Sequence, residues 1–213
     1  MKKFIPLLVF SLLLASCNID DTYTQTNVQD MVNVTNGQLY DDAGYLLNVV
    51  DDQVGAANWK VEGARYLAQF DILNRNLDIA LKKMMRANVV SATPYSAEEV
   101  LPQDPAQLFI HGASGGFMNL GFTYARSKTV QSPYSFTFRY ELKNGMLTIY
   151  AFFEGLDLSQ LQDGDDELTT ESQLFSIPIT ELGEVYNVTL VMYCVVEGAG
   201  EKYTVEKTTM NLL

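Results

Sequence analysis

Residues 112–116 spell Gly-x-Ser-x-Gly, a pattern in which the serine can act as a nucleophile in acyl transfer. Such a nucleophile elbow requires a strand, a sharp turn and then a helix, which together expose the serine hydroxyl above a sheet. Here the residues that follow, 117–124, alternate between two kinds of side chain as a strand does. The one histidine of the chain, His111, is only three residues from Ser114 and is poorly placed to act as its base. We therefore expect Ser114 to lie in a glycine-rich strand connection and expect no catalytic residue there.

Metal binding is limited by the same count of histidines. A zinc centre built on imidazole needs more than one histidine, and the chain has only one. The acidic segment 157–167 could offer oxygen ligands to calcium, although its order does not follow the EF-hand pattern. Its acidic residues are Asp157, Asp163, Asp165, Asp166 and Glu167. We favour a solvated acidic loop and expect neither a metal site nor a cofactor.

The densest basic cluster consists of Lys82, Lys83 and Arg86. Beside a small β-barrel, such a cluster could attract single-stranded nucleic acid. The formal net charge of −12 opposes this interpretation, because an acidic protein repels phosphate backbones. We expect a solvated strand with protective lysines and no nucleic-acid partner.

Trp59 is the one tryptophan of the chain and lies in the segment 52–63, between polar neighbours. An exposed tryptophan is a common anchor for a protein or glycan ligand. The alternative, which we favour, is that the ring folds back and caps a barrel of strands. Trp59 is kept as the candidate ligand contact.

The N-terminus has the order of a secretory signal. Lys2 and Lys3 precede an apolar run over 4–14, and small residues follow at Ala15 and Ser16. The run is shorter than the ~20 residues that span a bilayer. Leu14-Ala15-Ser16-Cys17 resembles the lipobox of bacterial lipoproteins. In that family the cysteine thiol receives a diacylglyceryl group, the chain is cut before the cysteine, and the new N-terminus is acylated, with fatty acids such as palmitate. Several acyl chains are needed for a stable anchor. We expect a signal peptide over 1–16, lipid on Cys17 and an acidic tether over 17–26.

Strand patterns fill the next part, 27–92. Gln38–Tyr40 and Tyr45–Val50 flank a glycine-containing turn and predict a hairpin. Period-two alternation over 66–73 and 77–81 predicts further strands, although residues 77–87 also fit helical spacing. About five strands result, which is the count of a small five-stranded barrel.

The three prolines at 94, 102 and 105 mark 93–106 as a linker between domains. Alternating runs over 118–124 and 136–142 begin the second domain, 107–213. Asn144-Gly145 is a strong hairpin signal, and three more strands are expected near 173–180, 185–196 and 202–211. About seven short strands indicate a β-sandwich.

The chain resembles the NigD-like lipoproteins of Bacteroidales. The resemblance depends on the lipobox, the hairpin over 37–44, the strand over 116–122 and the hairpin over 142–147. It implies an all-β protein with an N-terminal OB-like barrel followed by a C-terminal immunoglobulin-like sandwich, in agreement with the division above. It implies no catalytic residue and no site beyond the lipidated Cys17.

We therefore expect a lipoprotein of the cell envelope, held at the outer membrane by lipid on Cys17, on its periplasmic face or at the cell surface. Its function would be that of a non-catalytic module that binds a protein, peptide or glycan. The alternative is a glycan hydrolase, which needs two carboxylates facing one cleft at roughly 5–10 Å. The many Asp and Glu residues leave that alternative open.

Overall fold

The protein is described from a computed structural model, which covers residues 23–102, 104, 106–128, 134–155, 168–195 and 203–211 and gives side chains as far as residue 192. The leader, Cys17 and the acidic segment 157–167 lie outside these residues. The regular secondary structure of the described part is almost entirely β-strand, and it also includes one short α-helix, α2 (Ala56–Trp59), and one 3-10 turn, η2 (Thr180–Leu182). The prediction of an all-β protein is confirmed.

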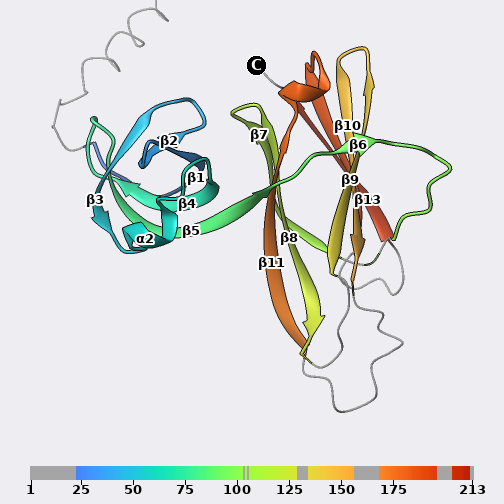
Figure 1. Ribbon diagram of the computed structural model, residues 1–213, viewed down its shortest axis with the longest axis horizontal. Coiled ribbons are helices and arrows are strands. Elements are labelled where there is room, and N and C mark those ends of the chain that lie inside the picture. Colours follow the sequence, from blue (N-terminus) through green and yellow to red (C-terminus); the bar gives the residue numbers. More distant parts are fainter. Residues whose placement is uncertain are drawn as a thin grey trace, which may run out of the picture.

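Five strands of the N-terminal part form a closed ring (Figure 1). They are β1 (Gln25–Thr35), β2 (Gln38–Asp41), β3 (Leu46–Asp52), β4 (Arg65–Ile72) and β5 (Asp78–Val89). Antiparallel pairing joins β1 to β2, β2 to β3, β1 to β4 and β4 to β5, and a parallel pairing of β3 with β5 closes the ring. The segment 77–87, whose spacing also fitted a helix, is strand from Asp78 onward.

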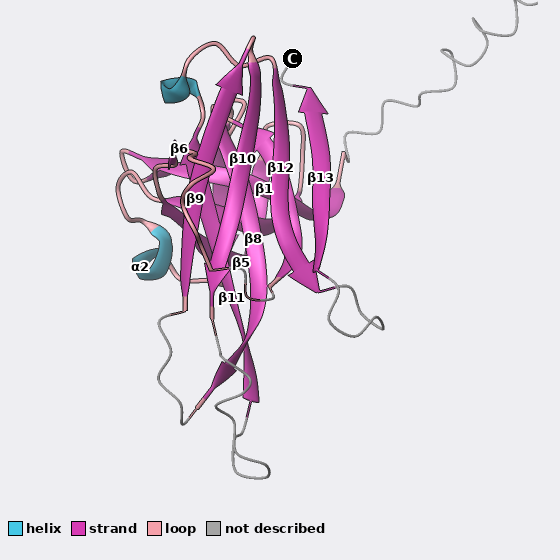
Figure 2. Ribbon diagram, turned by 90° about the vertical axis from the view of Figure 1, so that its right-hand side faces the viewer, coloured by secondary structure: helices cyan, strands magenta, loops and turns pink. Residues whose placement is uncertain are grey.

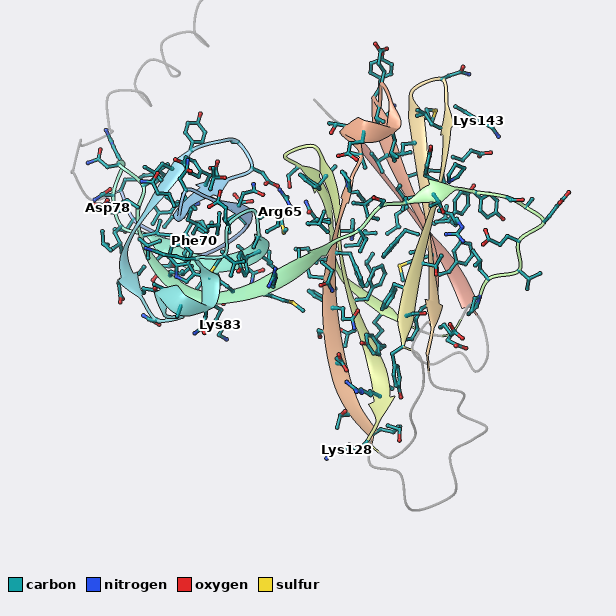
Figure 3. The ribbon with its side chains drawn as sticks, in the orientation of Figure 1. Arg65, Phe70, Asp78, Lys83, Lys128 and Lys143 are labelled. Atoms are coloured by element: carbon teal, nitrogen blue, oxygen red, sulfur yellow. The ribbon has the colours of Figure 1, made fainter. Side chains whose placement is uncertain are left out.

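Alternation of side chains produces the core of the ring. On β1, Val32 and Val34 are fully buried, and Leu39 of β2 and Leu47 of β3 face them from the predicted hairpin. Phe70 points into the ring in Figure 3 and is also buried. The period-two pattern of the sequence therefore reports the inner face of this part correctly.

The second part consists of two packed sheets (Figure 2). One sheet continues from β5 through β11 (Leu168–Pro178) and β8 (Phe117–Ser127) to β7 (Gln107–Ser114). The other has the order β13 (Tyr203–Asn211), β12 (Asn187–Val195), β10 (Met146–Glu154), β9 (Ser135–Lys143) and β6 (Thr93–Pro94). Asn144 and Gly145, with φ of 52° and 75°, form the predicted hairpin between β9 and β10.

Aromatic rings fill the space between these two sheets. Phe122 of β8 stacks on Phe136 of β9 with ring centroids 4.5 Å apart, and Phe136 stacks on Phe153 of β10 at the same distance. Phe175 of β11 lies 5.1 Å from both Phe136 and Phe138. The core thus joins residues from both sheets, as expected of a packed pair.

The two parts share strand β5. Its residues 87–89 pair in parallel with residues 174–176 of β11, and of these only Ala87 still pairs with β4 of the ring. The segment predicted as a linker, 93–106, begins after this junction and contributes β6, which pairs with β9. Tyr95 then stacks on Tyr150 with centroids 4.3 Å apart. The connection between the parts is therefore a strand of the sheet.

Candidate functional site

A buried charged network joins the ring to the second part. Arg65, at the start of β4, donates from Nη2 to Oδ2 of Asp42 at 2.8 Å, and the two side chains are 3% and 6% exposed. Arg65 also donates from Nη1 to Asn33 Oδ1 at 2.6 Å, and Asn33 donates from Nδ2 to Asp42 Oδ1 at 2.9 Å. Figure 3 shows Arg65 on the side of the ring that faces the second part. The ion pair of Arg65 and Asp42 therefore has hydrogen-bond partners within the ring itself.

The second part supplies the remaining partners. Ser114 donates to Asp42 Oδ2 at 2.5 Å and accepts from Asn119 Nδ2 at 3.0 Å. Ser176 accepts from Arg65 Nε at 3.3 Å and donates to Asn119 Oδ1 at 2.7 Å. We name these six residues, Asn33, Asp42, Arg65, Ser114, Asn119 and Ser176, the junction network. A buried ion pair with its lone pairs and protons satisfied in this way fixes the relative position of two surfaces.

Phe117 and Gly115 complete the packing around the junction network. The Arg65 guanidinium carbon lies 4.0 Å from the centre of the Phe117 ring, in a cation–π contact. A Cβ atom added at Gly115 would lie 2.6 Å from Asp42 Cγ, so only glycine allows this approach. The Gly-x-Ser-x-Gly pattern therefore forms a tight contact between the two parts.

The structure confirms that Ser114 lies in a strand connection. β7 ends at Ser114, β8 begins at Phe117, and the turn residues Gly115 and Gly116 have φ of 55° and 82°. A strand, and not a helix, follows the pattern. His111 is exposed on β7, and the hydroxyl of Ser114 is engaged by Asp42 and Asn119.

A second group of polar contacts surrounds Trp59, where α2 meets the ring. The side chain is 3% exposed and belongs to the core of the ring, so the structure has the capping arrangement and not an exposed anchor. Its Nε1 donates to Asp52 Oδ2 at 2.9 Å, and the other oxygen of Asp52 accepts from the backbone N–H groups of Val54 and Gly55. The Lys60 ammonium lies 5.2 Å from the centre of the indole.

These contacts shift the pKa of the Asp52 carboxyl. Desolvation by burial raises the pKa of its carboxyl, but the hydrogen bonds from Trp59, Gly55 and Val54 and the charge of Lys60 outweigh it. The net result is a pKa below the ordinary value, so Asp52 is an anion at neutral pH.

A pocket of about 270 Å³ opens beside this site. The pairing of β2 with β3 is short here and consists of Leu39 opposite Leu47 and Tyr40 opposite Leu46. Its lining comes from β2, β3 and α2 and includes Gln38, Asn48, Asp52, Trp59 and Lys60. We name it the Trp59 pocket. Although the indole is buried, it forms part of a pocket wall with amide, carboxylate and ammonium groups around it.

The three residues of the basic cluster have different surroundings in the structure. Lys82 pairs with Asp71 at 2.7 Å, Lys83 is exposed, and Arg86 lies further along β5. No group of three or more His, Cys, Asp or Glu side chains that could hold a metal ion occurs among the described residues. In the same part of the chain, no helix is long and apolar enough to cross a membrane.

Sequence analysis missed Arg65, Asp42 and Asn119 as partners. Asp42 lies in the glycine-containing turn of the predicted hairpin, where its neighbour Asp41 caps the turn by accepting from Tyr45 N–H at 2.7 Å. No local pattern distinguished Arg65, because Gln69 and Asp71 lie on the same alternating face of β4 and make that face look polar.

A closed five-stranded ring that shares a strand with a pair of packed sheets defines a two-part β protein. Solved structures with this fold include a protein of unknown function from Bacteroides vulgatus, with a TM-score of 0.61, 13% identity, and coverage of 88% of this chain and 91% of that chain. A NigD-like immunity protein from Bacteroides caccae matches with a TM-score of 0.57, 13% identity, and coverage of 86% and 92%. A candidate lipoprotein from Bacteroides fragilis matches with a TM-score of 0.54, 14% identity, and coverage of 88% and 98%.

At these identities the likeness concerns the fold, and at that level the resemblance to NigD-like proteins is confirmed. Neither the models of known protein families nor the curated proteins give a match to this chain.

Proposed function

We propose that this protein is a lipid-anchored accessory module of the cell envelope that binds a protein, peptide or glycan and carries out no catalysis. Lipid on Cys17 would hold it at the outer membrane. The leader with its Leu14-Ala15-Ser16-Cys17 ending supports the anchor. The names of two structural neighbours, an immunity protein and a candidate lipoprotein, agree with an accessory function at the envelope.

The observation that carries the non-catalytic part of the proposal is the use made of Ser114. The one sequence pattern for a nucleophile places its hydroxyl in a partly buried contact between two parts of the fold, where it donates to Asp42 and accepts from Asn119. The alternative of a glycan hydrolase needs two converging carboxylates. The Trp59 pocket has one carboxylate, Asp52, and the larger cleft beside β5 has one, Glu62.

The ring supports a more specific proposal for the binding surface. Its strand order, the parallel closure of β3 on β5 and a helix between β3 and β4 are typical of an OB-like barrel, and the packed sheets are typical of an immunoglobulin-like sandwich. OB-fold proteins bind oligomeric ligands over strands 2 and 3. The Trp59 pocket opens between those strands, and its mixture of amides and charges suits a polar ligand such as a glycan.

The anchor and the binding function are tested separately. The Cys17→Ala variant of the full chain should leave the membrane fraction on carbonate washing, whereas the unaltered chain should remain; retention of the variant would contradict the anchor. A glycan array probed with the full chain in detergent, beside an Asn48→Ala variant that alters the mouth of the Trp59 pocket, tests the ligand. Binding that is equal for both proteins would contradict this location.

A further inference from the structure

A cleft of about 710 Å³ lies where β5 leaves the ring. One wall is the segment Glu62–Arg65, and the other is the end of β5 from Arg86 to Val89 together with Val90. Phe175 of β11 contributes an apolar surface. Figure 1 shows β5 crossing between the two parts at this place. Ligand sites are common at such junctions, and this volume lies within the usual range of roughly 300–1,000 Å³.

One edge of β5 is unpaired inside this cleft. The pairing of β4 with β5 ends at Arg65 opposite Ala87, and the preceding chain turns toward β1, since Gly63 donates to Val34 O at 2.9 Å. On its other edge, β5 continues to pair with β11, and Val90 N–H donates to Ser176 O at 3.1 Å. Because successive N–H groups of a strand point in opposite directions, the N–H and C=O of Val89 point away from β11 and into the cleft.

The cleft also contains an unpaired cation. Arg86 is exposed, and no described residue forms a hydrogen bond, an ion pair or a cation–π contact with it. On a protein with a formal net charge of −12, a free guanidinium in a cleft is available for an anionic group of a ligand. Val89, which is 53% exposed, adds an apolar side chain to the cleft.

We propose that this cleft binds an extended peptide segment that adds as a short strand to β5 at Val89 and places an acidic side chain against Arg86. An unpaired backbone edge recognises another backbone, and alternate side chains of the added strand supply specificity. The inference adds a second site to the proposed function and takes up its peptide alternative there. The cleft is separate from the Trp59 pocket and requires neither the lipid nor a glycan.

A phage-displayed library of random octapeptides, selected on the full chain in detergent micelles, tests the proposal. Selected peptides should share an Asp or Glu at one position. Replacing Arg86 by Gln should raise the Kd of a selected peptide about tenfold, because a charge-assisted hydrogen bond is lost. The matched control is Arg75→Gln, which removes an exposed arginine in the turn between β4 and β5. The Kd of the selected peptide for this variant should stay within about twofold of its Kd for the unaltered chain.

Strand addition has its own signature. N-methylation along the selected peptide should weaken binding at every second residue and not at those between them, because only alternate N–H groups face β5. Val89→Pro should raise the Kd about fivefold, since it removes the donor that faces the cleft and leaves the Val90 bond to β11 in place.

Four outcomes would overturn the proposal. The first is a library that yields no selected sequence, and the second is an affinity for the selected peptide that Arg86→Gln leaves unchanged. The third is a set of N-methylation effects that do not alternate along the peptide. The fourth is that the acidic glycan polygalacturonate binds in a manner that depends on Arg86 while peptides do not bind. A failed Cys17→Ala or glycan-array test would leave this result unaffected, so the two proposals fail independently.

Discussion

Arg65 and Arg86 lie one residue apart in the same ladder, yet their surroundings differ completely. Arg65 of β4 stands opposite Ala87, and Arg86 of β5 stands opposite Tyr66. Arg65 is 3% exposed and donates to Asn33, Asp42, Asn119 and Ser176. Arg86 is exposed and has no partner among the described residues.

The difference shows how one residue type serves two purposes at one junction. Burial makes the partners of Arg65 obligatory, because an unpaired charge in the interior costs several kcal/mol. Exposure leaves Arg86 solvated at no such cost, so its charge is available for a ligand. Stability measurements should therefore separate the two arginines sharply.

The largest effect is expected for Arg65→Leu. The change leaves the Asp42 carboxylate buried without its cation, and we expect a loss of about 3–5 kcal/mol in the free energy of unfolding. Urea denaturation measures it. Arg86→Leu, the matched control on the neighbouring strand, should change stability by less than about 0.5 kcal/mol. Equal losses for the two variants would show that burial does not distinguish the contributions of the two arginines to stability.

Gly115→Ala should have the next largest effect. The added Cβ would lie 2.6 Å from Asp42 Cγ at a φ of +55°. The comparison is with Gly37→Ala, where φ is +70° and no atom lies within 4 Å. Both variants strain the backbone, so the crowding at Asp42 alone should make Gly115→Ala less stable than Gly37→Ala by about 1–3 kcal/mol. Thermal unfolding of both proteins measures that difference, and its absence would show that the junction tolerates a wider spacing.

Ser114→Ala should cost about 1–3 kcal/mol, because Asp42 and Asn119 each lose a partly buried hydrogen-bond partner. Ser135→Ala, which removes an exposed hydroxyl that donates to Glu154 at 3.3 Å, is the control and should change little. Urea denaturation compares the two. Ester hydrolysis by the unaltered chain that disappears with Ser114 would contradict the non-catalytic proposal.

The smallest effect concerns Asp52. Trp59→Phe keeps an aromatic side chain in the core of the five-stranded ring and removes the indole N–H, so the pKa of Asp52 should rise. Because the folded pKa lies below the unfolded value of about 3.9, Asp52 stabilises the fold above that pH, and the contribution is lost as the pH falls through the folded pKa. Trp59→Phe should reduce this contribution.

Carboxyl NMR titration of both proteins measures the pKa change. Asp78 is the internal control, since hydrogen bonds from Asn74 and Asn48 lower its pKa and do not involve Trp59. An unchanged Asp52 would show that the backbone N–H groups of Gly55 and Val54 dominate.

Local patterns of the sequence predicted much of this fold. Alternation over 66–73 and the Asn144-Gly145 turn correspond to β4 and to the β9–β10 hairpin, because period and turn chemistry are properties of neighbouring residues. For Ser114, the alternating residues that follow it were enough to predict a strand connection.

The junction network could not be predicted in this way. Ser114 and Asp42 are separated by 72 positions, and Arg65 and Ser176 by 111. Their contact exists only after the ring and the packed sheets have docked, and no local pattern encodes that docking. The unpaired edge at Val89 is likewise visible only once β4 is seen to end opposite Ala87.

Strand β5 has a consequence for how such a protein can change over time. Modules that are joined by a flexible linker can be exchanged by recombination within that linker. Here residues 79–81 of β5 close the ring against β3, while residues 87–89 pair with β11. A recombination point between the two parts would therefore divide β5, a strand that belongs to both of them. The two halves must therefore be inherited, and altered, as one piece.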